Sequence, residues 1–312
     1  RSGSVSEEEH EDEHGDDHGD EHGDEHGEVD YYNIDDTTSS FAVTLGRSLS
    51  DNLDVSLGYA SFERLPSSIE LFMNGPHMAT GRFEVGDPNL NSETSNNFDI
   101  TFNFDNGDFY AFASFYITDV DNYIALIDEE EEDHMDEDEH HEDEDEHHED
   151  EDEHDDHGNL IHANYMQKDA EFDGYEIEFG RSFDLGSGEL ALSFGRDVVN
   201  AEFADGHNVP RINPARNIYS LVYTQDDLLF KLMLKDVEKQ NDFGEGETAT
   251  DSYQMLNTRL TKTFNAMGNG ELKVSLFANN LLDEVARNHS SFVKDEVPLP
   301  GRNYGLKFNL TF

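Results

Sequence analysis

The chain has 312 residues, a formal net charge of −54 and no cysteine. The acidic balance excludes the basic surface that nucleic-acid binding requires, so we expect no nucleic-acid partner. The absence of Cys excludes disulfides and thiolate zinc sites, and without an apolar run of about 18 residues we expect no transmembrane helix.

Most of the excess charge lies in two tracts that mix His with carboxylates. Residues 7–28 hold 13 acids and residues 128–156 hold 22 of the 73 in the chain. Blocks of like charge this dense repel themselves, so we expect both tracts to be disordered without a counterion.

The first tract, within residues 1–30, repeats a His at every fourth position, and Gly follows four of the five. This spacing would align the imidazoles on one face of a helix. Each Gly costs about 1 kcal/mol relative to Ala in a helix, which argues against that structure. We interpret the tract as a flexible chelating tether that metal would order. Its candidate ligands are His10, His14, His18, His22 and His26.

Residues 31–312 alternate apolar and polar side chains in segments of about ten residues, which is typical of a membrane β-barrel. We expect about 11 strands and an all-β fold. A soluble sandwich or barrel would show similar alternation and stays open. The expected strands cover residues 39–49, 52–62, 96–105, 108–127, 170–183, 188–203, 217–225, 228–238, 252–264, 271–281 and 302–312.

The second tract falls in the long connection 128–169 between two of these strands. Its many interchangeable ligands predict several weak sites rather than one geometric site. Carboxylates alone would suit calcium, but imidazoles favour zinc, nickel, cobalt or copper. A solvated acidic loop that binds any divalent cation loosely is the alternative. Its candidate ligands are His134, His140, His141, His147, His148, His154 and His157.

Short and long connections alternate along the chain. Asn106-Gly107 is a strong hairpin signal on the short side. Bacterial outer-membrane barrels have short periplasmic turns and long extracellular loops, so both tracts are predicted to be extracellular. Single-chain bacterial barrels have even strand numbers, so 11 strands predict an incomplete barrel: the C-terminal half of a 22-stranded antiparallel transmembrane β-barrel.

Several motifs carry a family resemblance. The segments Glu63–Phe72, Asn74–Gly81 and Gly86–Ser95 resemble the region between two strands in TonB-dependent outer-membrane receptors. Asn279–Asp283 and Pro300–Arg302, before a strand that ends in Phe, resemble the C-terminal signature of these receptors. The Asn-Gly-Pro-His-x-Ala-Thr variant, with His-rich loops, is similar to the zinc-uptake branch of the family.

The resemblance implies a Gram-negative outer-membrane location and energy from the TonB–ExbB–ExbD complex. It divides the chain into an extracellular loop, residues 1–30, and the C-terminal part of a receptor barrel, residues 31–312. It also implies an N-terminal plug that contacts TonB, which we expect to be absent from this chain. It places His77 over the pore mouth, where His77 is a candidate metal ligand with Glu70 or with residues of the other half. We interpret His162, His207 and His289 as ordinary loop residues.

The leading hypothesis is therefore a receptor that lies in outer-membrane lipid and imports zinc, or another divalent metal, as its cargo. A receptor for a siderophore, haem or cobalamin is an alternative, although acidic loops would repel an anionic ferric siderophore. A soluble or surface metal-binding protein is another. An enzyme is the least favoured class, because the sequence offers no nucleophile–base arrangement, phosphate-binding loop or metal triad, and we expect no organic cofactor.

Overall fold

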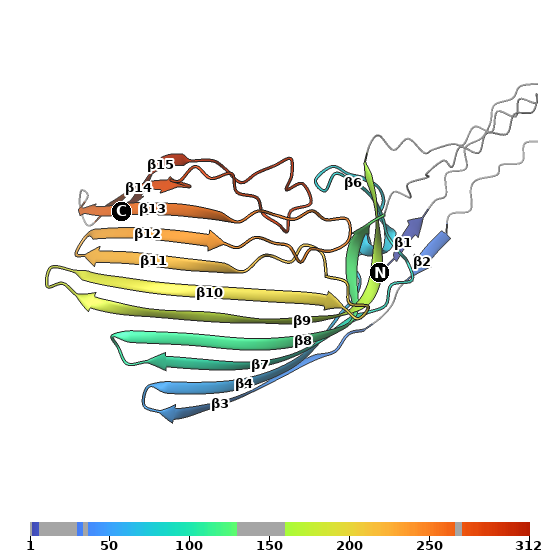
Figure 1. Cartoon of the computed structure of the whole chain (residues 1–312), viewed down its shortest axis with the longest axis horizontal. Helices are drawn as coiled ribbons and strands as arrows, with labels where there is room; N and C mark the ends of the chain where they lie inside the picture. Colours follow the sequence, from blue (N-terminus) through green and yellow to red (C-terminus); the bar gives the residue numbers. More distant parts are fainter. Residues whose placement is uncertain (1, 6–29, 34–36, 130–159, 266–269) are drawn as a thin grey trace, which may run out of the picture.

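The computed structural model of the chain describes residues 2–5, 30–33, 37–129, 160–265 and 270–312. Its main feature is one curved antiparallel sheet in which strands follow each other in chain order (Figure 1). All 11 expected strands are present, so the all-β antiparallel prediction is confirmed. The strands are β3 (Ser40–Ser50), β4 (Leu53–Arg64), β7 (Glu93–Asp105), β8 (Phe109–Asp128), β9 (Ile161–Asp184), β10 (Glu189–Phe203), β11 (Arg216–Gln225), β12 (Leu228–Val237), β13 (Tyr253–Asn265), β14 (Glu271–Asn279) and β15 (Asn303–Thr311).

The two ends of the sheet differ. At one end, neighbouring strands are joined by short turns, and the C-terminus lies there. At the other end lie the long connections, together with the segments through which both His-rich tracts leave the sheet (Figure 1). We call this second end the rim. The alternation of short and long connections is therefore as expected. The tracts themselves, and with them the expected disorder, lie outside the described residues.

Smaller elements at the rim were not expected from the sequence. The connection between β4 and β7 contains a short helix, α1 (Ser68–Phe72), and a hairpin formed by β5 (Asn74–His77) and β6 (Arg82–Val85). A separate antiparallel pair, β1 (Ser2–Val5) and β2 (Asp30–Asn33), brackets the first tract. At five residues α1 is far shorter than a bilayer-crossing helix, and the described part of the chain has no helix that is long and apolar enough to cross a membrane.

The strand β9 begins nine residues earlier than expected, at Ile161 rather than Ala170. Its first four residues pair in parallel with β6, from Arg82 opposite Ile161 to Val85 opposite Asn164. The same stretch pairs with the end of β8 on its other side. In the sequence, His162 and Gln167 lie in the long connection that holds the acidic tract. The pairing of this stretch with β6 could therefore not be anticipated.

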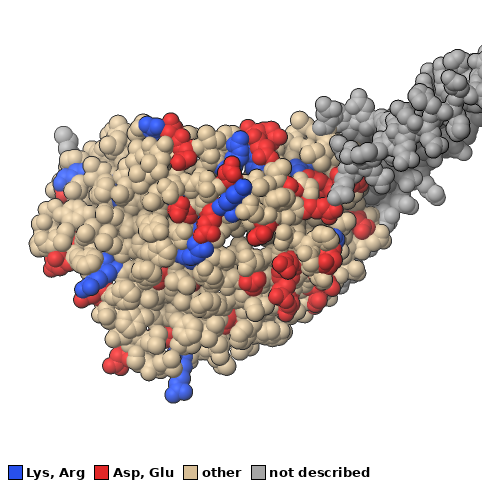
Figure 2. Space-filling view, in the orientation of Figure 1, with Lys and Arg blue, Asp and Glu red and all other residues tan. Residues whose placement is uncertain are grey.

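The sheet has one apolar face and one polar face. Along β15, Leu306 and Phe308 are more than 60% exposed, while Lys307 points to the opposite face. Leu306 lies beside Leu276 of β14, which is also exposed. Figure 2 shows mostly uncharged surface over the strands and acidic side chains gathered toward the rim. An exposed, continuous apolar strand face is what a barrel presents to lipid.

A β-bulge divides β8 into two parts. The pairing of β8 with β9 shifts between Val120 and Tyr123, and Asn122 has a φ of 56°. The Asn122 N–H donates to an Asp169 carboxylate oxygen at 2.9 Å, which holds the unusual conformation. Beyond the bulge, Tyr123 packs edge-on against Phe172. At the bulge the side chains that follow change faces, and Tyr123 packs against a small buried core at the rim.

Candidate metal-binding site

The β5–β6 hairpin holds His77 at its tip. The backbone N–H groups of Thr80 and Gly81 both donate to the His77 carbonyl oxygen, at 3.1 and 3.0 Å, and close the turn. Gly81 has a φ of 68°, a conformation that suits Gly. The turn places His77 opposite Arg82 in the hairpin register.

A buried carboxylate orients the His77 ring. Glu84 is 0% exposed, and its Oε1 lies 2.9 Å from His77 Nδ1. The Thr80 hydroxyl donates to the same oxygen at 2.6 Å, and the Tyr165 hydroxyl donates to Oε2 at 3.2 Å. Burial, together with the Glu84 charge, raises the pKa of Tyr165, so the phenol stays a donor. These contacts supply the partners that a buried carboxylate needs.

The geometry leaves one imidazole nitrogen available. Because a carboxylate only accepts hydrogen bonds, Nδ1 carries the proton that is shared with Glu84, and Nε2 retains a lone pair. The His77 side chain is 43% exposed, so a solute can reach it. Histidines that bind metals commonly donate their other N–H to a carboxylate, which fixes the tautomer and raises ligand basicity. His77 therefore has the arrangement of a pre-oriented ligand.

The expected partner, Glu70, is engaged elsewhere. Its carboxylate accepts the Ser67 backbone N–H at 2.5 Å and the Arg64 guanidinium at 2.9 Å. Burial alone would raise the pKa of Glu70, but the Ser67 hydrogen bonds and the Arg64 charge hold it below its ordinary value. In the described part of the chain no hydrogen bond or ion pair joins Glu70 to His77. Its position three residues after Ser67 makes it the second half of a capping box for α1.

The other candidate ligands, all 12 in the two tracts, lie outside the described residues. Within those residues there is no cluster of three or more His or carboxylate side chains arranged to hold a metal. The ends of the tracts are nevertheless placed. The second tract starts after Asp128 and returns into Ile161, which pairs with β6, and the first is bracketed by β1, which contacts α1. The second tract thus begins and ends at the hairpin that carries His77, and the first begins beside α1, which precedes that hairpin.

An arginine clamp secures this arrangement. The Arg82 guanidinium binds both oxygens of Asp128 at 2.5 Å, and both side chains are nearly inaccessible. The Phe292 ring lies 4.6 Å from the Arg82 guanidinium and 3.5 Å from that of Arg211. Burial, ahead of the opposing charges, lowers the pKa of Arg211. The clamp ties the start of the second tract to the hairpin and to two other rim loops.

Sequence reasoning missed Glu84, Thr80 and Tyr165. A signal for Glu84 was present: recognising residues 78–81 as a turn would have placed positions 77 and 84 on one face of a hairpin, since side chains alternate along each strand. Tyr165 carried no such signal, because the β6–β9 pairing that brings it near is parallel and joins segments 81 residues apart.

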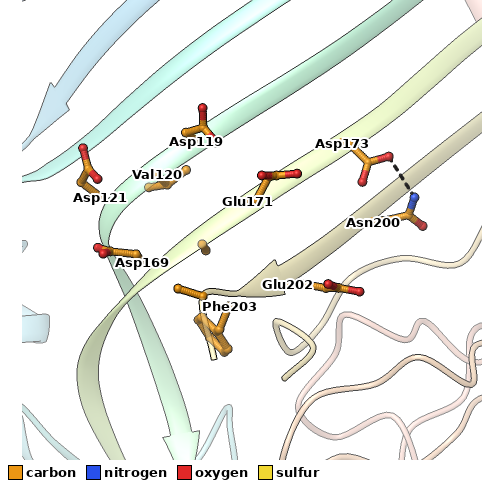
Figure 3. Close-up of a pocket in the computed structure, with 11 residues that line it drawn as sticks. Asp119, Val120, Asp121, Asp169, Glu171, Asp173, Asn200, Glu202 and Phe203 are labelled. Carbon is orange, nitrogen blue, oxygen red and sulfur yellow. Dashed lines mark hydrogen bonds between the residues drawn. The ribbon is translucent and has the colours of Figure 1, made fainter. Parts of the chain in front are cut away.

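A further cavity lies at the rim ends of β8, β9 and β10. It measures about 600 Å³ and is lined by six carboxylates without any His (Figure 3). Asp119, Glu171 and Glu202 lie side by side on adjacent strands. Carboxylate oxygens as a class suit hard cations, but among the described residues no three of these side chains are grouped so as to hold one ion. The cavity is therefore unsuited to select a metal that prefers imidazole.

The strand order, the one apolar face and the rim geometry all agree with a comparison to known families. A family model described as TonB dependent receptor-like, beta-barrel matches residues 10–281. The chain belongs to the TonB-dependent receptor family. Members of this family are outer-membrane receptors and transporters that work with the TonB system, rather than enzymes.

Solved structures share the fold at low sequence identity. The copper transporter OprC superposes with a TM-score of 0.67 at 18% identity and covers 90% of this chain. The FrpB iron transporter from Neisseria meningitidis has a TM-score of 0.53 at 14% identity and covers 89% of this chain. The siderophore receptor PirA from Acinetobacter baumannii has a TM-score of 0.56 at 14% identity and covers 88% of this chain. The chain spans 40% of the length of OprC, 39% of FrpB and 40% of PirA. Identities this low relate the folds and leave the cargo open.

Proposed function

We propose that this chain is part of an outer-membrane receptor that imports zinc into the periplasm, with energy from the TonB–ExbB–ExbD complex. One observation carries the proposal: the second His-rich tract begins and ends at a hairpin on which a buried carboxylate orients an accessible imidazole, and the first tract begins beside the helix that precedes this hairpin. In this scheme the tracts collect the ion, and His77 is the first selective ligand at the pore mouth.

The charge of the rim supports a cationic cargo. The acidic tracts add negative charge at the rim, which raises the local concentration of cations and repels anions. An anionic ferric siderophore would meet this barrier before it reached the barrel. A free divalent ion would be drawn toward it.

The His77 site favours zinc on chemical grounds. Zinc binds neutral imidazole and carboxylate oxygen, usually with four ligands. His77 supplies one ligand, and the Glu84 carboxylate already contacts its other ring nitrogen. The remaining ligands come from the tracts or from residues outside this chain, so selection at His77 requires the assembled receptor.

Copper is the second candidate cargo, and one residue favours it. Met78 follows His77 and is 79% exposed, which is unusual for a large apolar side chain. A thioether is a soft ligand that prefers copper(I). The similar fold of a copper transporter makes this candidate concrete. Zinc remains preferred because the tracts hold 12 His and a single Met.

The test is uptake of radiolabelled zinc by zinc-starved cells that carry the intact receptor, with and without a working TonB system. His77→Gln should raise the half-saturating zinc concentration at least tenfold without lowering receptor abundance. His207→Gln is the matched control, because His207 is also exposed and also contacts a carboxylate through Nδ1 but lies outside the β5–β6 hairpin. Met78→Leu separates the metals: it should leave zinc uptake unchanged, and a selective loss of copper uptake would replace zinc by copper. TonB-independent uptake, or a His77→Gln receptor equal to wild type, would contradict the proposal.

A further inference from the structure

A small cavity at the rim ends of β11, β12 and β13 differs in charge from the rest of the molecule. It measures about 150 Å³. Three cationic side chains line it: Arg216 at the start of β11, Lys235 near the end of β12, and Arg287 from the connection between β14 and β15. Tyr253, Asn288 and His289 complete its polar wall.

The side chains that line this cavity are positively charged, whereas the chain as a whole is strongly acidic. The sequence has 73 acids and only 19 Lys and Arg, yet three of the 19 line one small cavity and no acid does. The cavity at the rim ends of β8, β9 and β10 shows the opposite composition, with six carboxylates and no Lys or Arg. Like charges repel, so a cationic cluster needs a compensating anion.

The described residues satisfy only part of this positive charge. Arg216 donates through Nε to Asp197 at 2.7 Å, so it is paired. Arg287 Nη1 is buried and has no hydrogen-bond partner within the described part of the chain. Lys235 has no ion pair there either, and its ammonium lies 5.9 Å from the Tyr253 ring centroid. Arg287 and Lys235 therefore face the cavity without a direct ion pair among the described residues, and Asp197, which is bonded to Arg216, is the carboxylate whose charge also acts on Lys235.

Other charged groups nearby are occupied. His289 is fully buried; its Nδ1 lies 2.8 Å from the Thr250 hydroxyl, and its Nε2 faces Glu247 at 3.6 Å. Lys294 donates to Thr248 and Thr250. His289 thus forms a wall of the cavity, and Glu247 is directed to His289 and to the backbone N–H of Arg211 rather than to Arg287 or Lys235.

We propose that this cavity is a binding site for a small oxyanion of the size and charge of phosphate. The guanidinium of Arg287 offers paired donors that match phosphate or carboxylate oxygens, and Lys235 adds a point charge. Asn288 and Tyr253 can donate to the remaining oxygens. The bound anion would connect the 280–302 loop to β11 and β12, and so hold that loop at the rim.

The size of the cavity restricts the ligand. Its volume corresponds to about five water molecules at ~30 Å³ each. Organic ligands of drug size occupy sites of about 300–1,000 Å³, so a metal chelate of that size does not fit. The site is separate from His77, and its occupancy does not depend on which metal the receptor imports.

The experiment is calorimetric titration of the intact, metal-free receptor in detergent with inorganic phosphate, and separately with acetate as a carboxylate probe. Phosphate should bind saturably, and Arg287→Gln should weaken binding at least tenfold. Lys235→Gln should also weaken phosphate binding, and this second variant tests the proposal if Arg287→Gln fails to fold. Arg259→Gln is the control, because Arg259 lies on the same face of the sheet but outside the cavity.

The outcomes separate the sources of the oxyanion. Phosphate binding that the two cavity variants lose and the control retains supports a site for a free phosphate-sized anion. Tighter binding of acetate than of phosphate would assign the site to a carboxylate. An intact receptor that binds neither probe would mean that these cations are neutralised from within the protein, and would overturn the proposal. Phosphate affinity unchanged in both cavity variants would also overturn it.

Discussion

At the scale of single residues, the decisive group near His77 is one that solvent cannot reach. Glu84 is fully buried, and all of its contacts are to side chains that position it or that it positions: His77, Thr80 and Tyr165. A buried carboxylate that accepts from the imidazole, a hydroxyl and a phenol holds the imidazole in one orientation. At the proposed zinc site, we therefore expect the metal affinity of His77 to depend on a residue that does not touch the metal.

Glu84→Gln should weaken zinc binding at His77 about 10- to 100-fold, because the amide keeps the size of the side chain but loses the charge that orients the ring. The measurement is zinc affinity of the intact receptor by competition with a chelating dye. Glu63→Gln is the control, since Glu63 is bonded to Ser39 at the far edge of the sheet. Equal zinc affinity in Glu84→Gln and wild type would remove Glu84 from the site.

At the scale of elements, the hairpin depends on the short helix that precedes it. The Ser67 hydroxyl accepts the Glu70 N–H and the Glu70 carboxylate accepts the Ser67 N–H, which stabilises five residues that could not form a helix alone. Leu71 of α1 is fully buried beside Leu90 and Ile124. The Gly86 N–H then donates to the Met73 carbonyl at 2.6 Å and connects the end of the helix to the residue after β6.

Ser67→Ala should cost about 0.5–2 kcal/mol of local stability, because it removes the N-cap acceptor. Hydrogen exchange of the amides in residues 68–73 measures this directly, and protection should fall there while the strands below stay unchanged. The neighbouring Ser68→Ala is a matched control, since Ser68 is exposed and does not cap the helix. Equal protection in the two variants would show that burial of Leu71, rather than the cap, holds α1.

How much the sequence predicts also depends on the element. Alternation with a period of two predicted the 11 strands that follow one another in the sheet, since apolar and polar side chains alternate along most of each strand. It failed for β5 and β6, which have four residues each and carry Gly75 and Pro76. It also failed for the first nine residues of β9, because residues 161–169 owe their strand structure to pairing with β6 and β8 rather than to a local pattern. His77 was predicted as a candidate ligand, but its partner was not, because that contact depends on the hairpin register.

At the scale of the whole molecule, the two faces of the sheet predict where lipid lies. Leu306→Arg should destabilise the folded receptor by about 2–4 kcal/mol if Leu306 is near the bilayer midplane. Asn309→Arg should have little effect, because Asn309 shares the polar face with Lys307. Urea unfolding in lipid vesicles, followed by heat-modifiable migration on gels, measures both variants. Greater damage from Asn309→Arg than from Leu306→Arg would reverse the assignment of the faces.

The second tract can be removed without touching the clamp. Replacing residues 131–158 by a short Gly-Ser linker keeps Asp128 on Arg82 and keeps β9 intact. Zinc uptake should fall several-fold at limiting zinc and recover at saturating zinc, because the tract concentrates the ion but does not form the path. Surface abundance of the receptor is the control. Unchanged uptake at limiting zinc would count against a role in capture.

The bulge at Asn122 has a consequence for how such a rim can change over evolutionary time. Side chains of a strand alternate between faces, so one extra residue exchanges the faces for everything that follows. Above Asn122 the exchange places Asp128 toward Arg82 and directs Tyr123, Ala125 and Ile127 to the opposite core. The lipid-facing part of β8 is unaffected by that exchange. A gain or loss of one residue at this position would therefore exchange the side-chain contacts of the rim in one step and leave the strand pairing below the bulge unchanged.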